Sequence, residues 1–120
     1  MHASSLEGWS LERFLTLNEP AFLELFARSP IRRADRGGFL RNVCIAMGNR
    51  GEARYAAPLT HALAHDPDAL VRGHAAWALG RVLRALAGSE HTVALGALRG
   101  AAAADADVWV RDEATQALNG

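Results

Sequence analysis

Apolar side chains recur three and four residues apart along much of the chain, which is the spacing of one face of an α-helix. The clearest stretch is residues 70–82, whose apolar positions are Leu70, Val71, Ala75, Ala78, Leu79 and Val82. Two shorter stretches, residues 10–17 and 18–26, show the same spacing. The second opens with Asn18 as a helix N-cap and Pro20 in the first turn, where its missing N–H costs nothing. The pattern predicts an all-α protein.

Three of the expected helices share one pattern. An apolar residue is followed by an arginine, a small residue stands three positions after the arginine, and a pair similar to Ala-Leu ends the segment. The matching segments are residues 39–48, 70–80 and 109–118. Their arginines, Arg41, Arg72 and Arg111, are 31 and 39 residues apart. Such spacings suit a repeat of two helices, with the first helices at residues 54–65 and 90–103. The fold class expected is a short α-solenoid of helical hairpins preceded by two short N-terminal helices.

The chain of 120 residues has the length of one domain. We expect N-terminal helices and a basic linker over residues 1–38 and the repeat region over 39–120, packed together as that single domain. Gly48 and Gly80 close the shared pattern, so they are expected to end their helices in the left-handed conformation. Gly73 lies inside a helix, which leaves two explanations open: a close contact between helices, or backbone approach to a ligand.

The basic residues are unevenly distributed. All 13 are arginine and the formal net charge is zero. Either a GC-rich genome or a preference for the planar guanidinium, which binds phosphate and carboxylate, would explain the missing lysine. Residues 28–54 contain seven arginines and two acidic residues. The candidate phosphate-binding residues are Arg32, Arg33, Arg36 and Arg41, with Arg28 and Arg50 behind them, beside a helix N-terminus expected near Phe39.

The other repeat arginines have a structural explanation. Arg72 and Arg111 begin helices that follow aspartate-containing turns, so we expect them to pair with Asp66 or Asp105. A ladder of such pairs would stiffen a solenoid.

No complete catalytic or metal centre is evident. His61 and His65 are four residues apart, a spacing that can share a zinc ion, but no third ligand is recognisable, so a surface pair is expected. Cys44, the one cysteine, lies in an apolar run and is expected to be a buried structural thiol. No Ser-His-Asp arrangement or phosphate-binding glycine loop is present. Trp77 is expected in the core, whereas the position of Trp109 near a helix start leaves its role open, including stacking on a partner or a base.

The start of the chain lacks the basic region and apolar run of a signal peptide, and no stretch approaches the ~20 apolar residues of a membrane span. The expected setting is cytoplasmic and reducing, with no contact to a membrane.

Two motifs in a fixed order carry a family resemblance. Residues 29–33, Ser-Pro-Ile-Arg-Arg, lead through Arg36 into an Arg-Asn-x-x-x-Ala-x-Gly-Asn helix over residues 41–49. HEAT-like repeats, with Asp-Pro-Asp and the Arg-Gly-His-Ala-Ala-Trp stretch of residues 66–80, follow them. Over residues 11–118 this arrangement resembles the C-terminal region of epoxyqueuosine reductases, bacterial enzymes of tRNA modification.

The resemblance implies a function that this chain does not perform alone. The family reduces epoxyqueuosine in tRNA to queuosine with a cobalamin and two [4Fe-4S] clusters. Catalytic and ferredoxin-like domains hold these cofactors and precede the HEAT-like part, so no cofactor is expected in this chain. The expected function is a tRNA-docking and structural domain, whose partners are the anticodon arm of tRNA and those two domains of the parent enzyme.

Two alternatives stay open. A freestanding HEAT-repeat scaffold would bind protein through one face and would show no RNA affinity. A HEAT-type lyase resembling those that attach bilins would need a nucleophile or an acid, and neither can be named.

Overall fold

A computed structural model describes residues 10–27 and 35–120, and this part of the chain is helical throughout, with no strand. Its helices are α1 (Leu11–Leu15), α2 (Glu19–Leu25), α3 (Arg36–Arg50), α4 (Ala56–His65), α5 (Ala69–Val82), α6 (Gly88–Ala104) and α7 (Val108–Asn119). Two single 3₁₀ turns, η3 (Ala53–Tyr55) and η4 (Leu83–Ala85), precede α4 and follow α5. The all-α class is confirmed.

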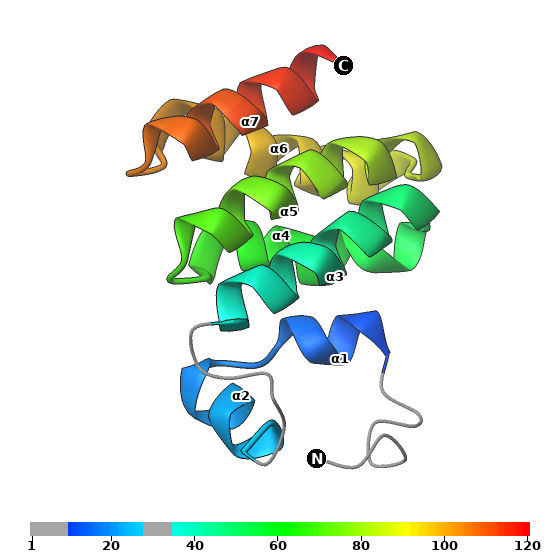
Figure 1. Cartoon of the computed structure of the whole chain (residues 1–120). Helices are drawn as coiled ribbons and strands as arrows, with labels where there is room; N and C mark the ends of the chain where they lie inside the picture. Colours follow the sequence, from blue (N-terminus) through cyan, green and yellow to red (C-terminus); the bar gives the residue numbers. More distant parts are fainter. Residues whose placement is uncertain (1–9, 28–34) are drawn as a thin grey trace.

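The helices form two stacked layers. Helices α3, α5 and α7 lie one above another in front, with α4 and α6 behind them, while α1 and α2 lie at the lower end (Figure 1). Helices α4 and α5 make one hairpin, and α6 and α7 make the next. The expected solenoid of two-helix repeats with short N-terminal helices is therefore what forms.

Local sequence signals account for most helix starts. Asn18 Oδ1 accepts the backbone N–H of Ala21 at 2.9 Å, as expected of an N-cap. Asp68 and Asp107 cap α5 and α7 in the same way, accepting from the residues two positions on. Pro20 lies in the first turn of α2, where no hydrogen bond is lost.

The glycine predictions at helix ends are wrong. Helix α3 begins at Arg36, three residues before the expected start, and passes through Gly48 to end at Gly51, whose φ is +63°. Gly80 likewise lies inside α5. Both are needed for close packing: a Cβ on Gly48 would lie 2.5 Å from the Trp77 ring, and one on Gly80 would lie 2.7 Å from the Ala117 Cβ.

A continuous apolar core runs between the two layers, and a smaller cluster lies under α2. Phe39 of α3 joins them, because its ring lies 5.2 Å from those of Phe14 and Phe26 and 5.8 Å from that of Phe22. The N-terminal helices are thus attached to the solenoid through aromatic packing.

Candidate nucleic-acid interface

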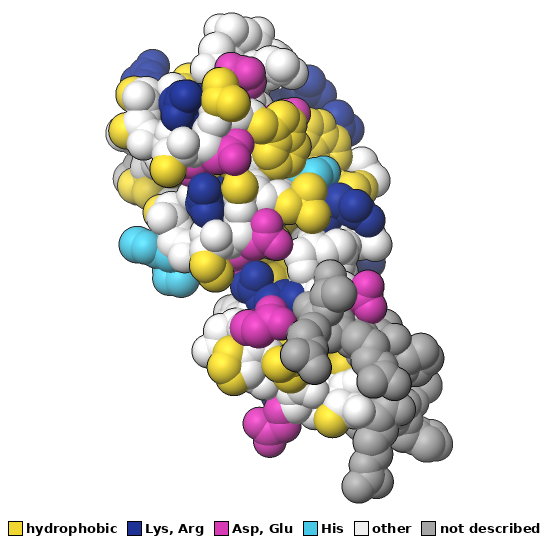
Figure 2. Space-filling model, turned by 60° about the vertical axis from the view of Figure 1, so that its left-hand side comes forward, with side chains coloured by type: hydrophobic (Ala, Val, Ile, Leu, Met, Phe, Trp, Pro, Cys, Tyr) yellow, Lys and Arg dark blue, Asp and Glu magenta, His cyan; other side chains and the backbone are white. Residues whose placement is uncertain are grey.

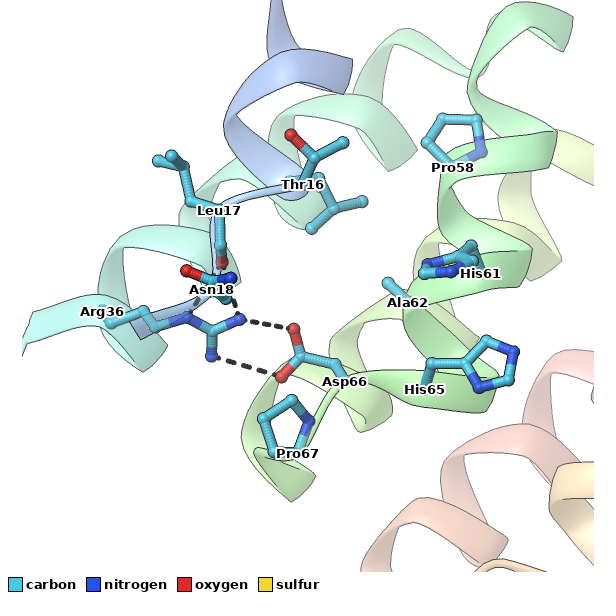
Figure 3. Close-up of a pocket in the computed structure, with 11 residues that line it drawn as sticks. Thr16, Leu17, Asn18, Arg36, Pro58, His61, Ala62, His65, Asp66 and Pro67 are labelled. Carbon is cyan, nitrogen blue, oxygen red and sulfur yellow. Dashed lines mark hydrogen bonds and ion pairs between the residues drawn. The ribbon is translucent and has the colours of Figure 1, made fainter. Parts of the chain in front are cut away.

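Three of the six predicted phosphate-binding residues, Arg28, Arg32 and Arg33, lie outside the described residues. Arg36 lies inside and is buried, with 5% of its surface exposed. Its Nη2 and Nη1 donate to Asp66 at 2.8 and 3.3 Å, while Nε and Nη2 donate to the Leu17 carbonyl at 3.1 and 2.9 Å. Figure 3 shows the guanidinium turned toward the Asp66 carboxylate. The guanidinium of Arg36 is therefore engaged within the fold, and its buried position does not support the predicted phosphate contact.

A pocket of about 240 Å³ lies beside this ion pair, between the α1–α2 connection and α4. Thr16, Asn18, Pro58 and His61 line it along with the ion pair itself (Figure 3). The two charged groups neutralise each other, so Arg36 offers no free positive charge to an anion in this pocket.

The two histidines at metal-ligand spacing are both exposed, with ring centroids 4.7 Å apart. Within residues 10–27 and 35–120, no three His, Cys, Asp or Glu side chains lie where they could jointly hold a metal ion. His61 and His65 are therefore a surface pair on α4.

The expected arginine–aspartate pairing is confirmed for Arg72, whereas Arg111 reaches only the backbone of the aspartate turn. Arg72 Nε and Nη2 donate to the two Asp105 carboxylate oxygens at 3.0 and 3.2 Å, and its Nη1 donates to the Asp66 carbonyl at 3.0 Å. Arg111 Nη1 donates to the Asp105 carbonyl at 2.6 Å. Each arginine thereby ties a front helix to the turn that precedes it.

The ion pair between Arg72 and Asp105 shifts the pKa values of both residues. Burial alone would raise the pKa of Asp105, but hydrogen bonds from Arg72 and from the Asp107 backbone N–H, with the charges of Arg72 and Arg111, lower it below its ordinary value. The hydrogen bond to Asp105 is the largest cause that raises the pKa of Arg72. Both groups are held in their charged forms.

Arg41 and Arg50, the remaining predicted residues, lie on α3 at separate places. Arg41 is partly buried, with its Nε 3.4 Å from Asn42 Oδ1, and Arg50 is exposed, with Nη1 donating to the Tyr55 hydroxyl at 3.3 Å. Nine residues of helix separate them by about 14 Å. The structure does not bring the described members of the set into one patch.

The side of α3, α5 and α7 turned away from α4 and α6 contains a feature that the sequence did not reveal; we call this side the front face. A groove of about 330 Å³ crosses it, lined by Ile45, Asn49, Gly73, His74, Trp77, Trp109 and Glu113. Figure 2 shows hydrophobic side chains gathered around a histidine on this side of the molecule, with arginines beside them.

Two glycines position the indoles of the groove. The Trp77 ring packs on Gly48 of α3, and the Trp109 ring packs on Gly73 of α5, so closely that neither glycine has space for a side chain. The close helix contact is thus the correct explanation of Gly73. Trp77 is partly buried against the core, while Trp109 keeps 37% of its surface exposed.

His74 completes the aromatic wall. Its ring centroid lies 5.3 Å from that of Trp109, and its Nδ1 lies 2.8 Å from the Leu70 carbonyl. In the neutral ring this contact places the proton on Nδ1 and leaves Nε2 as an acceptor.

Arginines that the charge count did not single out lie at one end of this groove. The Arg81 guanidinium sits over the Trp77 ring, 5.3 Å from its centroid, and its Nε donates to the Gly48 carbonyl at 3.1 Å. Arg81 and Arg84 line a hollow of about 260 Å³ with Asn49 and Gly51. Residues 55–120 contain more acidic residues than arginines. The net charge of that segment therefore did not indicate this local concentration of positive charge.

Cys44 is fully buried in α3. Burial, with a smaller contribution from the Asp66 charge, raises the pKa of its thiol to about 12. The expectation of a buried structural thiol is confirmed.

Across the described residues, no helix combines the length and apolar character needed to cross a membrane.

The sequence matches the family model for HEAT repeats over residues 31–119. It is 38% identical over 81 residues to an epoxyqueuosine reductase of Alicycliphilus denitrificans, a match covering 62% of this chain and 22% of the relative. It is 33% identical over 76 residues to an epoxyqueuosine reductase of Xanthomonas campestris, covering 63% and 21%. The matched region is the C-terminal part of these enzymes, so the chain spans about a fifth of the curated relatives it matches. No solved structure matches the chain significantly.

Proposed function

Because this chain belongs to the family of HEAT-repeat proteins, we propose that it acts by binding, as the tRNA-docking and structural part of an epoxyqueuosine reductase. The similarity to the C-terminal region of two such enzymes is the observation that carries this proposal. The reduction of epoxyqueuosine to queuosine in tRNA is performed by the parent enzyme, and this chain is not catalytic by itself.

The residues of this chain do not fit the cofactors of that chemistry. An iron–sulfur cluster needs several cysteine thiolates, whereas Cys44 is single, buried and protonated. In this proposal, other domains of the parent enzyme hold cobalamin and the clusters, and those domains are partners of this chain.

The uneven arginine distribution supports RNA docking. Guanidinium groups of residues 28–54 neutralise backbone phosphates of the anticodon arm, which positions the RNA without reading its sequence. The residues proposed for these contacts are Arg32, Arg33 and Arg41, with Arg28 and Arg50 behind them. Arg36 is left out because Asp66 and the Leu17 carbonyl occupy its guanidinium.

Fluorescence anisotropy with an anticodon stem-loop RNA, measured over a range of salt concentrations, tests the proposal. The variant Arg32→Ala with Arg33→Ala should bind more weakly, and each lost phosphate contact should reduce the slope of log affinity against log salt by about 0.7–0.9. Arg41→Ala should lose about one such contact. Arg99→Ala removes the same charge from an exposed site on α6 and is the matched control.

Unchanged affinity and salt slope in the double variant would contradict the assignment of those residues. An equal loss in the Arg99→Ala control would show a general charge effect in place of a docking site.

A freestanding HEAT-repeat scaffold that binds protein is the second candidate. The match to HEAT repeats over residues 31–119 favours it, because stacked repeats form extended surfaces that bind partners. This candidate predicts no RNA affinity even at low salt, so the same titration separates the two.

A further inference from the structure

We propose that the front-face groove is a slot for one unpaired nucleobase of a single-stranded RNA loop. This inference rests on the proposed RNA-docking function and names a second, different contact within it. Phosphate contacts bind the RNA backbone, whereas the groove binds an unpaired base that is not stacked on the neighbouring bases of the RNA.

The stacking surface is preformed. Trp109 has 37% of its surface exposed, yet its ring is held against α5, where it packs on Gly73 and contacts the His74 imidazole. An exposed indole that the fold holds rigidly offers a flat apolar face with little conformational entropy left to lose on binding. Bases of any sequence stack on such a face.

The groove also has polar groups suited to the edge of a base. Its lining includes the Asn49 amide and the Glu113 carboxylate. In the neutral ring of His74, the hydrogen bond from Nδ1 to the Leu70 carbonyl leaves Nε2 as an acceptor. A small number of polar groups within an apolar wall is typical of a small-ligand site, and about 330 Å³ is within the usual size range.

Charge favours a nucleotide over an apolar peptide as the occupant. Arg81 lies over the Trp77 ring and lines, with Arg84, the hollow that shares Asn49 with the groove. On the other side, Arg41 lies one helical turn before Ile45, on the same face of α3. Arginines on both sides of an aromatic slot match the phosphates that flank a base in a strand, and among the described residues Glu113 is the one acidic side chain in the lining of the groove.

The test compares two RNA probes on the full chain: a hairpin with an unpaired loop, and a blunt duplex with the same number of phosphates. The hairpin should bind more tightly and should quench tryptophan fluorescence, while the duplex should bind through phosphates without the quench. Trp109→Leu, which keeps an apolar side chain over Gly73, should weaken hairpin binding about tenfold and leave duplex binding unchanged. Trp109→Phe, which keeps an aromatic ring, should lose only a few-fold.

Val93→Ala is the matched control, because Val93 is an exposed apolar residue on α6, and it should change neither affinity. Circular dichroism verifies that each variant is folded, and the wild-type quench is informative even where a variant does not fold.

Equal affinity and equal quenching for the two probes would overturn the slot and leave the phosphate-docking function standing. An equal loss of both affinities in folded Trp109→Leu would also overturn it. Absence of binding to either RNA at low salt would overturn the docking function and the slot together, and would favour the protein-binding scaffold.

Discussion

Arg36 and Asp66, thirty residues apart in the sequence, form a buried ion pair with two hydrogen bonds that fastens the start of α3 to the turn after α4. Only 6% and 5% of the two side chains are exposed. The pair is completed by the Leu17 carbonyl, which accepts from the same guanidinium. An arginine chosen from the sequence as an RNA contact is instead part of the interior of the fold.

Removing this arginine should be strongly destabilising. Arg36→Ala leaves the Asp66 carboxylate buried without its cation, which typically costs about 3–5 kcal/mol. Urea unfolding monitored by circular dichroism measures the loss. Arg54→Ala is the control, because its ion pair with Glu52 is exposed and should contribute little. Similar stability of the two variants would contradict the structural role of Arg36.

A pair of glycine substitutions should have opposite signs. Gly48→Ala places a Cβ 2.5 Å from the Trp77 ring and 3.1 Å from the Ala78 Cα, so the two helices must shift, at about 1–3 kcal/mol. Gly96→Ala meets nothing within 4 Å inside α6, so it should stabilise the protein by about 0.5–1 kcal/mol. Thermal and urea unfolding of both variants provide the check, and stabilisation by Gly48→Ala would refute the close contact.

Acid should remove the contribution of Asp105. Its pKa in the folded protein lies below the ordinary value, so the folded state favours the carboxylate and its stabilisation is fully present at neutral pH. This contribution is lost as the pH falls from about 4, the unfolded-state value, through the lower pKa of the folded state. Asp105→Asn should therefore be less stable than wild type at pH 7, and the difference should shrink below about pH 4. A difference that does not change with pH, measured by urea unfolding at each pH, would argue against the ion pair.

The thiol of Cys44 should be inert in the folded protein. It is fully buried and its pKa is raised to about 12, so almost no thiolate exists at pH 8. A thiol reagent such as iodoacetamide should label the chain slowly in buffer and rapidly in denaturant, as mass spectrometry would record. Rapid labelling in buffer, with the far-ultraviolet circular dichroism unchanged, would contradict the buried position.

Helix positions could be predicted from the sequence because their signals are local. The N-caps Asn18, Asp68 and Asp107 and the apolar spacing lie within the segments they define. Helix ends were less predictable. A glycine can either end a helix or allow a neighbouring helix to pack closely. Gly48 has the second role because Trp77 packs on it, and Trp77 lies on another helix, so the sequence around Gly48 does not show which role applies.

The candidate site shows the same division between local and long-range information. The alignment of repeats predicted Asp66 or Asp105 as the partner of Arg72, and the ion pair forms with Asp105, since these residues belong to the repeating pattern. It equated Arg41 with Arg72, however, whereas Arg36, one turn earlier, makes the corresponding bond to Asp66. The front-face groove could not be predicted, because Trp77 and Trp109 occupy different places in their helices and meet only after stacking.

The arginine–aspartate ladder has a consequence for how the chain unfolds. Its members, Arg36, Asp66, Arg72, Asp105 and Arg111, alternate without a break from α3 to α7. In an array whose repeats contact only their neighbours, one end can melt while the other persists. Here the melting of one end would break the Arg36–Asp66 or the Arg72–Asp105 ion pair and leave a desolvated charge in the next unit, so partly melted states are costly. The described repeats should therefore unfold as one cooperative unit.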